Sequence, residues 1–317
     1  MVLAIAFVFP GQGSQSVGML AELAETGAVR DTFAAASTVL GYDLWEVVQH
    51  GPRERLDVTE CTQPAMLTVG VAMWRLWQEH GGPCPQAMAG HSLGEYTALV
   101  CGGAIDFATA VGLVQFRGRL MQEAVPAGQG AMAAVLGLDD TGVEASCKES
   151  STASEIVEPV NYNAPGQVVI AGHTTAVDRA IEAVRASGAR RAIRLPVSVP
   201  SHSSLMQPAA VRLGERLAKT DISIPEVGSI YTVGLRKHET ADGIRSALVE
   251  QLYSPVRWTD TIQAMRDNDD ITLIVECGPG KVLTGLNRRI DRGIAAHAIF
   301  DSDSLDAALS SAKEAAS

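Results

Sequence analysis

A serine held in a short glycine turn is the residue of this chain best suited to covalent chemistry. Ser92 lies at the centre of Gly90-His91-Ser92-Leu93-Gly94, where a short apolar strand gives way to a helical segment. A G-x-S-x-G turn in that context exposes the serine hydroxyl, and the unpaired N–H groups of the helix start face the same point. The pattern predicts a nucleophile beside a site that stabilises negative charge, although a simple strand-to-helix turn has the same form.

A serine nucleophile requires a base, and seven histidines compete for that role. His202 stands in a loop that enters a helix, where an imidazole can project into a cleft. His91 adjoins Ser92 but is expected to point away from it on a tight turn. The remaining histidines lie in segments that resemble solvated ends: His50, His80, His173, His238 and His297. Spacing alone leaves the base unassigned, because a surface or core position is the commoner role for any one histidine.

The segments around Ser92 predict an α/β domain. An apolar run at residues 3–9, followed by a loop rich in glycine, is typical of a buried parallel strand. Helical spacing of apolar residues follows at 63–79 and 106–123, with the strand 87–90 between them. Later elements are expected as helices at 205–219, 241–252 and 259–267, a buried strand at 271–276 and a last helix at 282–290.

The middle of the chain follows a different pattern. Its elements are expected as a strand at 131–136, a helix at 141–149, strands at 156–160 and 168–171, a helix at 176–186 and a strand at 191–195. This β-α-β-β-α-β order is the ferredoxin-like motif. The sequence therefore predicts an α/β-hydrolase-like domain with a parallel sheet, formed by residues 1–127 and 197–317. A smaller ferredoxin-like subdomain at residues 128–196 is inserted into it.

Composition argues against several classes of function. With 25 Lys and Arg against 36 Asp and Glu, the chain has a net charge of -11, which disfavours binding to nucleic acid or an anionic membrane. The five cysteines form no C-x-x-C pair, so neither a disulfide framework nor a zinc site is predicted. No apolar run reaches the roughly 18 residues of a membrane span. We expect a cytoplasmic protein without a bound metal or cofactor.

The strongest indication of function is a set of six short motifs in a fixed order. They are Phe9-Pro10-Gly11-Gln12-Gly13-Ser14-Gln15, Gly90-His91-Ser92-Leu93-Gly94-Glu95, Gln115-Phe116-Arg117-Gly118, Asn161-Tyr162-Asn163-Ala164-Pro165-Gly166-Gln167, Pro200-Ser201-His202 and Glu276-Cys277-Gly278-Pro279-Gly280. Together they resemble the malonyl-CoA:acyl carrier protein transacylases of the discrete bacterial type, which act in fatty acid synthesis. The resemblance extends from Phe9 to about Ile290.

The resemblance implies a role for several residues. Ser92 becomes the acylated nucleophile and His202 its base, while the backbone N–H groups of Gln12 and Leu93 form an oxyanion hole. Arg117 is expected to bind the free carboxylate of a malonyl group, since a guanidinium offers two parallel N–H donors. On the sequence alone, an ordinary helix salt bridge is the commoner role for such an arginine.

Two further positions follow from the same resemblance. A backbone carbonyl near Gln251 is expected to orient the histidine in place of the acidic residue of a triad. We hypothesise that this neutral group avoids a second negative charge beside the malonyl carboxylate. Asn163 is expected to line the cleft from the subdomain.

The resemblance also implies a reaction route and partners. In a ping-pong reaction, the serine takes malonyl from malonyl-CoA and passes it to the phosphopantetheine thiol of acyl carrier protein, so CoA is part of a substrate. Carrier protein is acidic, and repulsion by a chain of net charge -11 is screened only beyond about 8 Å, so docking requires a local basic patch. The candidates are Arg190, Arg191, Arg194, Lys281, Arg288 and Arg289. A serine hydrolase and an inert carrier-binding scaffold remain the alternatives.

Overall fold

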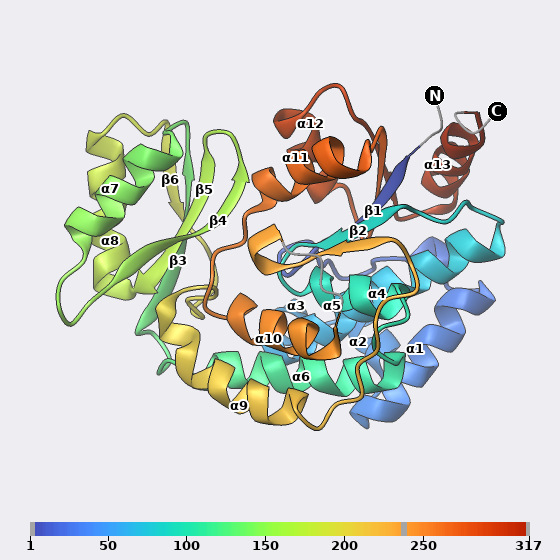
Figure 1. Ribbon diagram of the computed structural model, residues 1–317. Coiled ribbons are helices and arrows are strands. Elements are labelled where there is room, and N and C mark those ends of the chain that lie inside the picture. The colour runs from blue at the N-terminus through green and yellow to red at the C-terminus, as the bar shows by residue number, and fades with distance from the viewer. Residues whose placement is uncertain (1–3, 236–239, 315–317) are drawn as a thin grey trace.

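The computed structural model describes residues 4–235 and 240–314 of the chain. It is built on two sheets that lie in separate parts of the molecule (Figure 1). The larger part has a five-stranded sheet in the order β7-β2-β1-β8-β9, and all of its strand pairs are parallel. The smaller part has a four-stranded antiparallel sheet. The predicted combination of a parallel α/β core with a ferredoxin-like unit is confirmed.

The parallel sheet is buried on both faces, as expected for strands connected by helices. Its strands are β1 (Ile5–Phe9), β2 (Ala87–Gly90), β7 (Ser229–Tyr231), β8 (Leu273–Cys277) and β9 (Ala295–Ile299). β1 lies at the centre, and its side chains alternate between two apolar clusters: Phe7 enters one and Val8 the other. On the first face, the ring of Phe7 meets those of Trp74 and Trp77 edge-on, with both pairs of ring centroids 5.1 Å apart.

Helices cover the two faces of this sheet unequally. The helices of the larger part are α1 (Gly27–Leu40), α2 (Leu44–His50), α3 (Arg53–Leu56), α4 (Thr59–Glu79), α5 (Gly94–Cys101), α6 (Phe107–Glu123), α9 (Gln207–Leu217), α10 (Ala241–Gln251), α11 (Trp258–Asp269), α12 (Val282–Ile290) and α13 (Ser302–Glu314). Only α11 and α12 contribute to the cluster on the Val8 face, and the others pack on the opposite side. Short 3-10 turns occur at Ala21–Leu23, Ser204–Met206 and Val233–Leu235.

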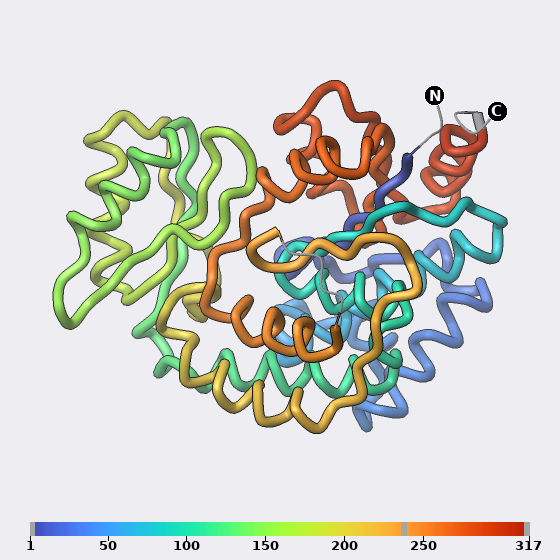
Figure 2. The backbone as a smooth tube through the Cα atoms, viewed as in Figure 1, coloured from blue at the N-terminus to red at the C-terminus, as the bar shows by residue number. Residues whose placement is uncertain are grey.

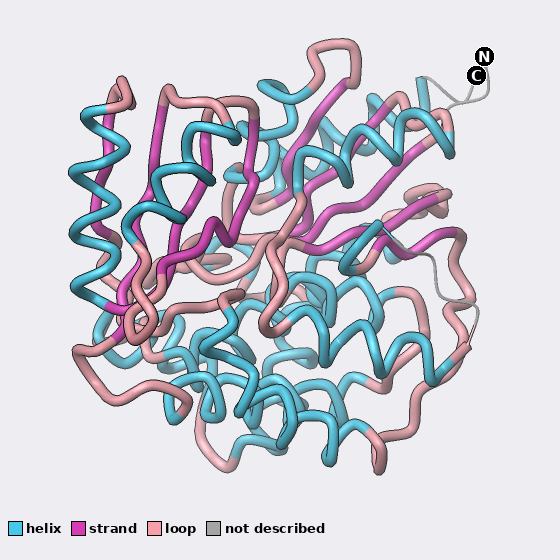
Figure 3. Tube along the Cα trace, turned by 60° about the vertical axis from the view of Figure 1, so that its left-hand side comes forward, coloured by secondary structure: helices cyan, strands magenta, loops and turns pink. Residues whose placement is uncertain are grey.

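The smaller part has the predicted β-α-β-β-α-β order. Its elements are β3 (Gly130–Leu136), α7 (Asp140–Ser150), β4 (Val157–Ala164), β5 (Gln167–His173), α8 (Thr174–Ala186) and β6 (Arg191–Arg194), with the strand order β4-β5-β3-β6. α7 and α8 pack on one face of this sheet (Figure 3). The other face carries a small apolar cluster that includes Met132 and Val160. This second face is therefore available to form a wall of a cleft.

The smaller part is joined to the rest of the molecule through β4. Asn161 forms an isolated parallel bridge with Val256, in the segment that precedes α11. The path of the chain in Figure 2 shows how this segment, between α10 and α11, runs beside the small sheet before it returns to the parallel sheet.

Some elements were not predicted. Helix 282–290 has the expected bounds, but the prediction that it is the last helix is wrong, because β9 and α13 follow it. β7 has only three residues and is too short to be recognised as a strand. β9 is alanine-rich and lacks the run of branched side chains that marks a strand.

The described residues contain no helix that is long and apolar enough to cross a membrane.

The glycines of the turn around Ser92 are required by close backbone contacts. A Cβ atom added to Gly90 would lie 1.7 Å from the carbonyl carbon of Gly94. A Cβ atom added to Gly94 would lie 1.9 Å from the carbonyl oxygen of Phe9. Both atoms belong to the backbone and cannot move aside as a flexible side chain would, so β1, β2 and α5 meet at this point only without side chains.

We expect Gly94→Ala to lower the free energy of unfolding by about 3 kcal/mol, because overpacking here must displace β1 or α5. Gly285→Ala is the control: Gly285 is exposed on α12, no atom lies within 4 Å of its added Cβ, and this change should stabilise the protein by about 0.5–1 kcal/mol. Urea denaturation measures both. Equal midpoints for Gly94→Ala and the parent would contradict the steric argument.

Candidate active site

Two residues of the predicted site have backbone conformations that are rare for their type. Ser92 has φ of 54° at the junction of β2 and α5, and His202 has φ of 63° in the loop before α9. The left-handed region costs a residue with a Cβ atom about 1–2 kcal/mol. Such strain persists only where the surrounding structure imposes it, and it is often found at functional sites.

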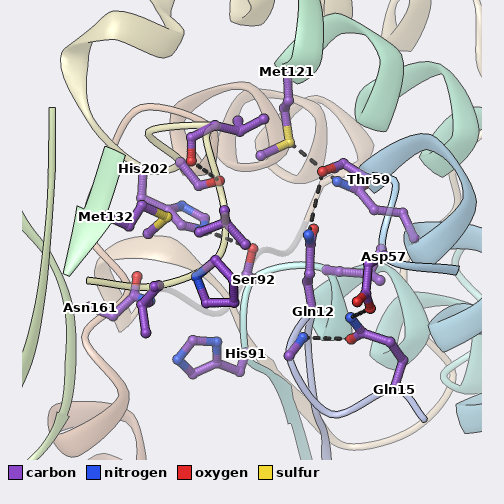
Figure 4. A pocket seen from close by; sticks show the side chains of 18 of the residues that line it. Gln12, Gln15, Asp57, Thr59, His91, Ser92, Met121, Met132, Asn161 and His202 are labelled. Carbon is purple, nitrogen blue, oxygen red and sulfur yellow. Dashed lines mark hydrogen bonds between the residues drawn. The ribbon is translucent and has the colours of Figure 1, made fainter. Parts of the chain in front are cut away.

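Ser92 and His202 form a hydrogen-bonded pair. The Oγ of Ser92 lies 2.6 Å from Nε2 of His202 (Figure 4). Nδ1 of the same ring lies 2.8 Å from the backbone oxygen of Gln251. A carbonyl oxygen can only accept, so Nδ1 carries the ring proton and Nε2 has the free lone pair. His202 is thus in the tautomer that accepts the hydroxyl proton of Ser92.

The environment keeps His202 uncharged. Burial and then the Arg117 cation lower the pKa of His202 to about 3, and the hydrogen bond to Gln251 only partly opposes them. The imidazole is therefore neutral throughout the physiological pH range and available as a base. Protonation of this ring is unfavourable as long as the Arg117 charge is unopposed.

Arg117 is a buried cation with uncharged partners. It is 1% exposed, and Nη1 donates to Oε1 of Gln63 while Nη2 donates to Oε1 of Gln251, both at 2.9 Å. Nη2 also lies 3.4 Å from the Oγ of Ser92. Among the described residues, every hydrogen bond of this guanidinium goes to a neutral oxygen, and Nε has no partner. An unopposed buried charge of this kind is costly, and a nearby anion would stabilise it.

A cavity of about 330 Å³ connects these groups to the surface. Gln12, Leu93, Arg117 and Met121 line it together with Ser92. Within residues 4–235 and 240–314, the backbone N–H groups of Gln12 and Leu93 have no acceptor. Both amides therefore remain available to an oxygen bound in this cavity.

The smaller part of the molecule supplies the opposite wall. Met132 of β3 and Asn161 of β4 line the cavity together with Val197 and Val199 of the segment that follows β6. Figure 4 shows Met132 beside His202, with Asn161 on the same side of the site. The cavity is thus a cleft between the two sheets.

Two expectations about polar residues are corrected by the structure. Asn163 does not line the cavity; it is 8% exposed and its Oδ1 lies 2.8 Å from Nε2 of His91. The pairing of β4 with β5 shifts between Tyr162 and Ala164, so Asn161 rather than Asn163 faces the cleft. His297 lies in β9 rather than at a solvated end, and His238 lies outside the described residues.

Sequence reasoning assigned no role to Gln63 or Glu95. Gln63 belongs to a helix that was recognised only by its apolar spacing, and no local signal relates it to Arg117, 54 positions away. Glu95 ends the motif around Ser92 and is buried, with Oε2 2.7 Å from Nε2 of Gln251. Its position beside the nucleophile in that motif was the available signal.

Comparisons with known proteins identify the family of this chain. The family model of the acyl transferase domain matches residues 6–290. The chain is 54% identical to the malonyl CoA-acyl carrier protein transacylase of Escherichia coli (strain K12), and the match covers 96% of this chain and 98% of that protein. The chain is a member of the malonyl-CoA:acyl carrier protein transacylase family. The family model ends at Ile290, the last residue of α12, so β9 and α13 lie beyond it.

Solved structures of transacylases have the same fold. The enzyme of Coxiella burnetii superposes with a TM-score of 0.95 at 50% identity, covering 98% of both chains. A malonyl-transacylase in complex with a type II PKS acyl-carrier protein also gives a TM-score of 0.95, at 52% identity over 97% of this chain and 99% of that one.

The backbone strain at Ser92 can be measured. We expect Ser92→Gly to be more stable to unfolding than Ser92→Ala by up to about 1 kcal/mol, because glycine adopts a positive φ without a Cβ clash. Both changes remove the same hydroxyl, so the comparison isolates the backbone. Denaturant melts of the two variants provide the measurement. A more stable alanine variant would show that Ser92 is not strained.

Proposed function

We propose that this protein transfers a malonyl group from malonyl-CoA to the phosphopantetheine thiol of acyl carrier protein, through a malonyl ester of Ser92. The observation that carries the proposal is the Arg117 cation, buried beside the nucleophile with only neutral oxygens as partners. Each terminal nitrogen of a guanidinium has a second N–H, so Arg117 can bind a carboxylate without releasing Gln63 or Gln251.

The first half-reaction forms the acyl-enzyme. The Oγ of Ser92 attacks the thioester carbon of malonyl-CoA while its proton moves to Nε2 of His202. The thioester oxygen becomes an oxyanion, which the N–H groups of Gln12 and Leu93 stabilise. When this intermediate collapses, the C–S bond breaks, and His202 donates the proton that it took from Ser92 to the CoA sulfur.

The bound malonyl group assists this step. The Arg117 charge disfavours the imidazolium form of His202, and the substrate carboxylate opposes that charge. Binding of malonyl therefore raises the basicity of His202, whereas an acetyl group leaves it low. The site selects its substrate through the strength of its base as well as through contact.

The second half-reaction reverses the first. His202 takes the proton of the carrier thiol, the sulfur attacks the malonyl ester, and the oxyanion forms again between the same two amides. Collapse breaks the C–O bond, and the proton passes from His202 to the Oγ of Ser92. The nucleophile is thereby restored without any net proton change.

Incubation with malonyl-CoA, followed by intact mass measurement with and without carrier protein, tests the proposal. We expect an adduct of one malonyl group that disappears when carrier protein is added and reappears on its thiol. Release of free malonate alone would support a hydrolase, and absence of an adduct would support a scaffold.

Arg117→Ala should lower kcat/KM for malonyl-CoA by about 100-fold or more, the effect of truncating one partner of a buried charge pair. Slow acylation by acetyl-CoA should not fall, because that substrate has no carboxylate. Arg119→Ala, an exposed position on the same helix, is the matched control. Equal losses with both substrates would refute the proposed carboxylate contact.

The proposal also requires a docking surface for an acidic carrier protein. Three of the six predicted basic residues, Arg190, Arg191 and Arg289, line one surface cavity of about 440 Å³, here termed the arginine pocket. Arg289 reaches from α12 to the turn between β4 and β5, where it donates to the backbone oxygen of Pro165 at 3.3 Å. The pocket joins both parts of the molecule and supports docking at their junction.

The other three candidates are less favourable for docking. Arg194 pairs with Asp178 at 2.7 Å, and neither Arg194 nor Arg288 lines the arginine pocket. Lys281 lies at the opposite end of α12 from the arginine pocket.

Arg190→Glu combined with Arg289→Glu should raise the KM for carrier protein about tenfold, because charge reversal at a rim weakens encounter with an acidic partner. Acylation of Ser92 by malonyl-CoA should keep its rate. Arg216→Glu, exposed on α9, changes net charge at another face and serves as the control. Steady-state transfer and intact mass separate the half-reactions. Equal damage to both would exclude the arginine pocket as a docking site.

A further inference from the structure

A buried carboxyl group lies behind the nucleophile and has no part in the mechanism above. Glu95, the second residue of α5, is 3% exposed. Its Oε2 accepts a hydrogen bond from Nε2 of Gln251 at 2.7 Å. Its Oε1 has no hydrogen-bond partner in residues 4–235 and 240–314. Because buried polar atoms are nearly always paired, this arrangement requires a physical explanation.

Glu95 contacts Gln251, the residue that lies between Arg117 and His202. Nε2 of Gln251 donates both to Glu95 and to the backbone oxygen of Ser92, the latter at 2.9 Å, so Oε1 of Gln251 faces Arg117. In the reversed orientation, the amide would present a donor to a guanidinium that can only donate. The backbone oxygen of Gln251 also holds His202, so this residue couples the cation to the base.

The surroundings of Glu95 favour its protonated form. A carboxylate oxygen buried without a donor is costly, whereas an uncharged acid is less so. Glu95 forms no salt bridge with Arg117 among the described residues, whose guanidinium donates to Gln63, Ser92 and Gln251. Burial raises the pKa of Glu95 to about 8, against the opposing effects of the Gln251 hydrogen bond and the Arg117 cation.

We propose that Glu95 is a positioning residue: as an uncharged acid, it fixes the amide of Gln251 towards Arg117 and leaves that cation free to bind the malonyl carboxylate. This inference rests on the function proposed above. When Glu95 loses its proton, the new anion interacts with Arg117 and competes with the substrate carboxylate. Malonyl binding then weakens as the pH rises, whereas binding of a substrate without a carboxylate does not.

The other charged and titratable groups around Glu95 change charge outside this pH range. Within the described chain, they come from α5 itself, from α6, from the loop before α9, and from the lining of a cavity of about 30 Å³ that Glu95 shares. The pKa of His202 is lowered to about 3, and burial raises the pKa values of Tyr96 and Tyr231. Arg117 and Arg257 stay protonated.

The pH dependence of KM for malonyl-CoA tests the proposal. In the parent protein, KM should rise about tenfold between about pH 7 and pH 9, because Glu95 is neutral below its pKa and ionised above it. Glu95→Gln should abolish this rise, since the amide keeps an acceptor for Gln251 and cannot ionise. An unchanged rise in Glu95→Gln would overturn the proposal. Glu276→Gln, at another buried glutamate, is the control and should keep the rise.

Two further measurements do not depend on that variant. Glu95→Leu has no acceptor for Gln251 and should raise the malonyl-CoA KM about tenfold at neutral pH, with Glu95→Gln restoring it. In the unmodified protein, acylation by acetyl-CoA should show no loss of affinity over the same pH range. A parallel loss with both substrates would assign the effect to CoA or to folding and would overturn the proposal.

A failure of this inference about Glu95 can be distinguished from a failure of the proposed transfer reaction. Formation of the malonyl adduct at neutral pH tests the transfer reaction without reference to Glu95. A protein that forms and transfers this adduct, but whose KM shows no dependence on the ionisation of Glu95, would retain the proposed function and lose this inference.

Discussion

A guanidinium buried without a carboxylate partner is the constraint on which the rest of the site depends. Arg117 directs its N–H groups to the amide oxygens of Gln63 and Gln251 and towards the hydroxyl of Ser92. An uncompensated buried charge is costly, so these dipoles must be held in fixed positions. Helices α4 and α10 accordingly meet α6 at this point, and burial together with the same cation keeps His202 neutral.

The absence of a carboxylate beside His202 in the described structure follows from the same constraint. A backbone carbonyl sets the tautomer of the ring at 2.8 Å without adding charge, whereas an aspartate there would pair with Arg117 and occupy its place for malonyl. The carbonyl stabilises an imidazolium less well than a carboxylate does. In the reaction proposed here, substrate binding offsets this loss, because the malonyl carboxylate opposes the Arg117 charge. Specificity and basicity therefore depend on the same ion.

The parallel sheet provides rigidity at the strained Ser92. Ser92 and His202 have positive φ angles, which persist only where the neighbouring structure determines them. β1 is buried on both faces, and its end meets the turn of Ser92 through backbone contacts too close for any Cβ atom at Gly90 or Gly94. The second sheet then closes the cleft with Met132 and separates the site from solvent on that side.

The sequence by itself determined the features that depend on local patterns. The turn at Ser92, the central strand and the ferredoxin-like order could be predicted because glycine turns and the periods of strands and helices act over a few residues. Short or alanine-rich strands such as β7 and β9 lack that signal. Only the tertiary structure brought Gln63, Glu95 and Gln251 around Arg117. These three residues and Arg117 come from four different helices, and the hydrogen bonds among them join positions that no local pattern relates.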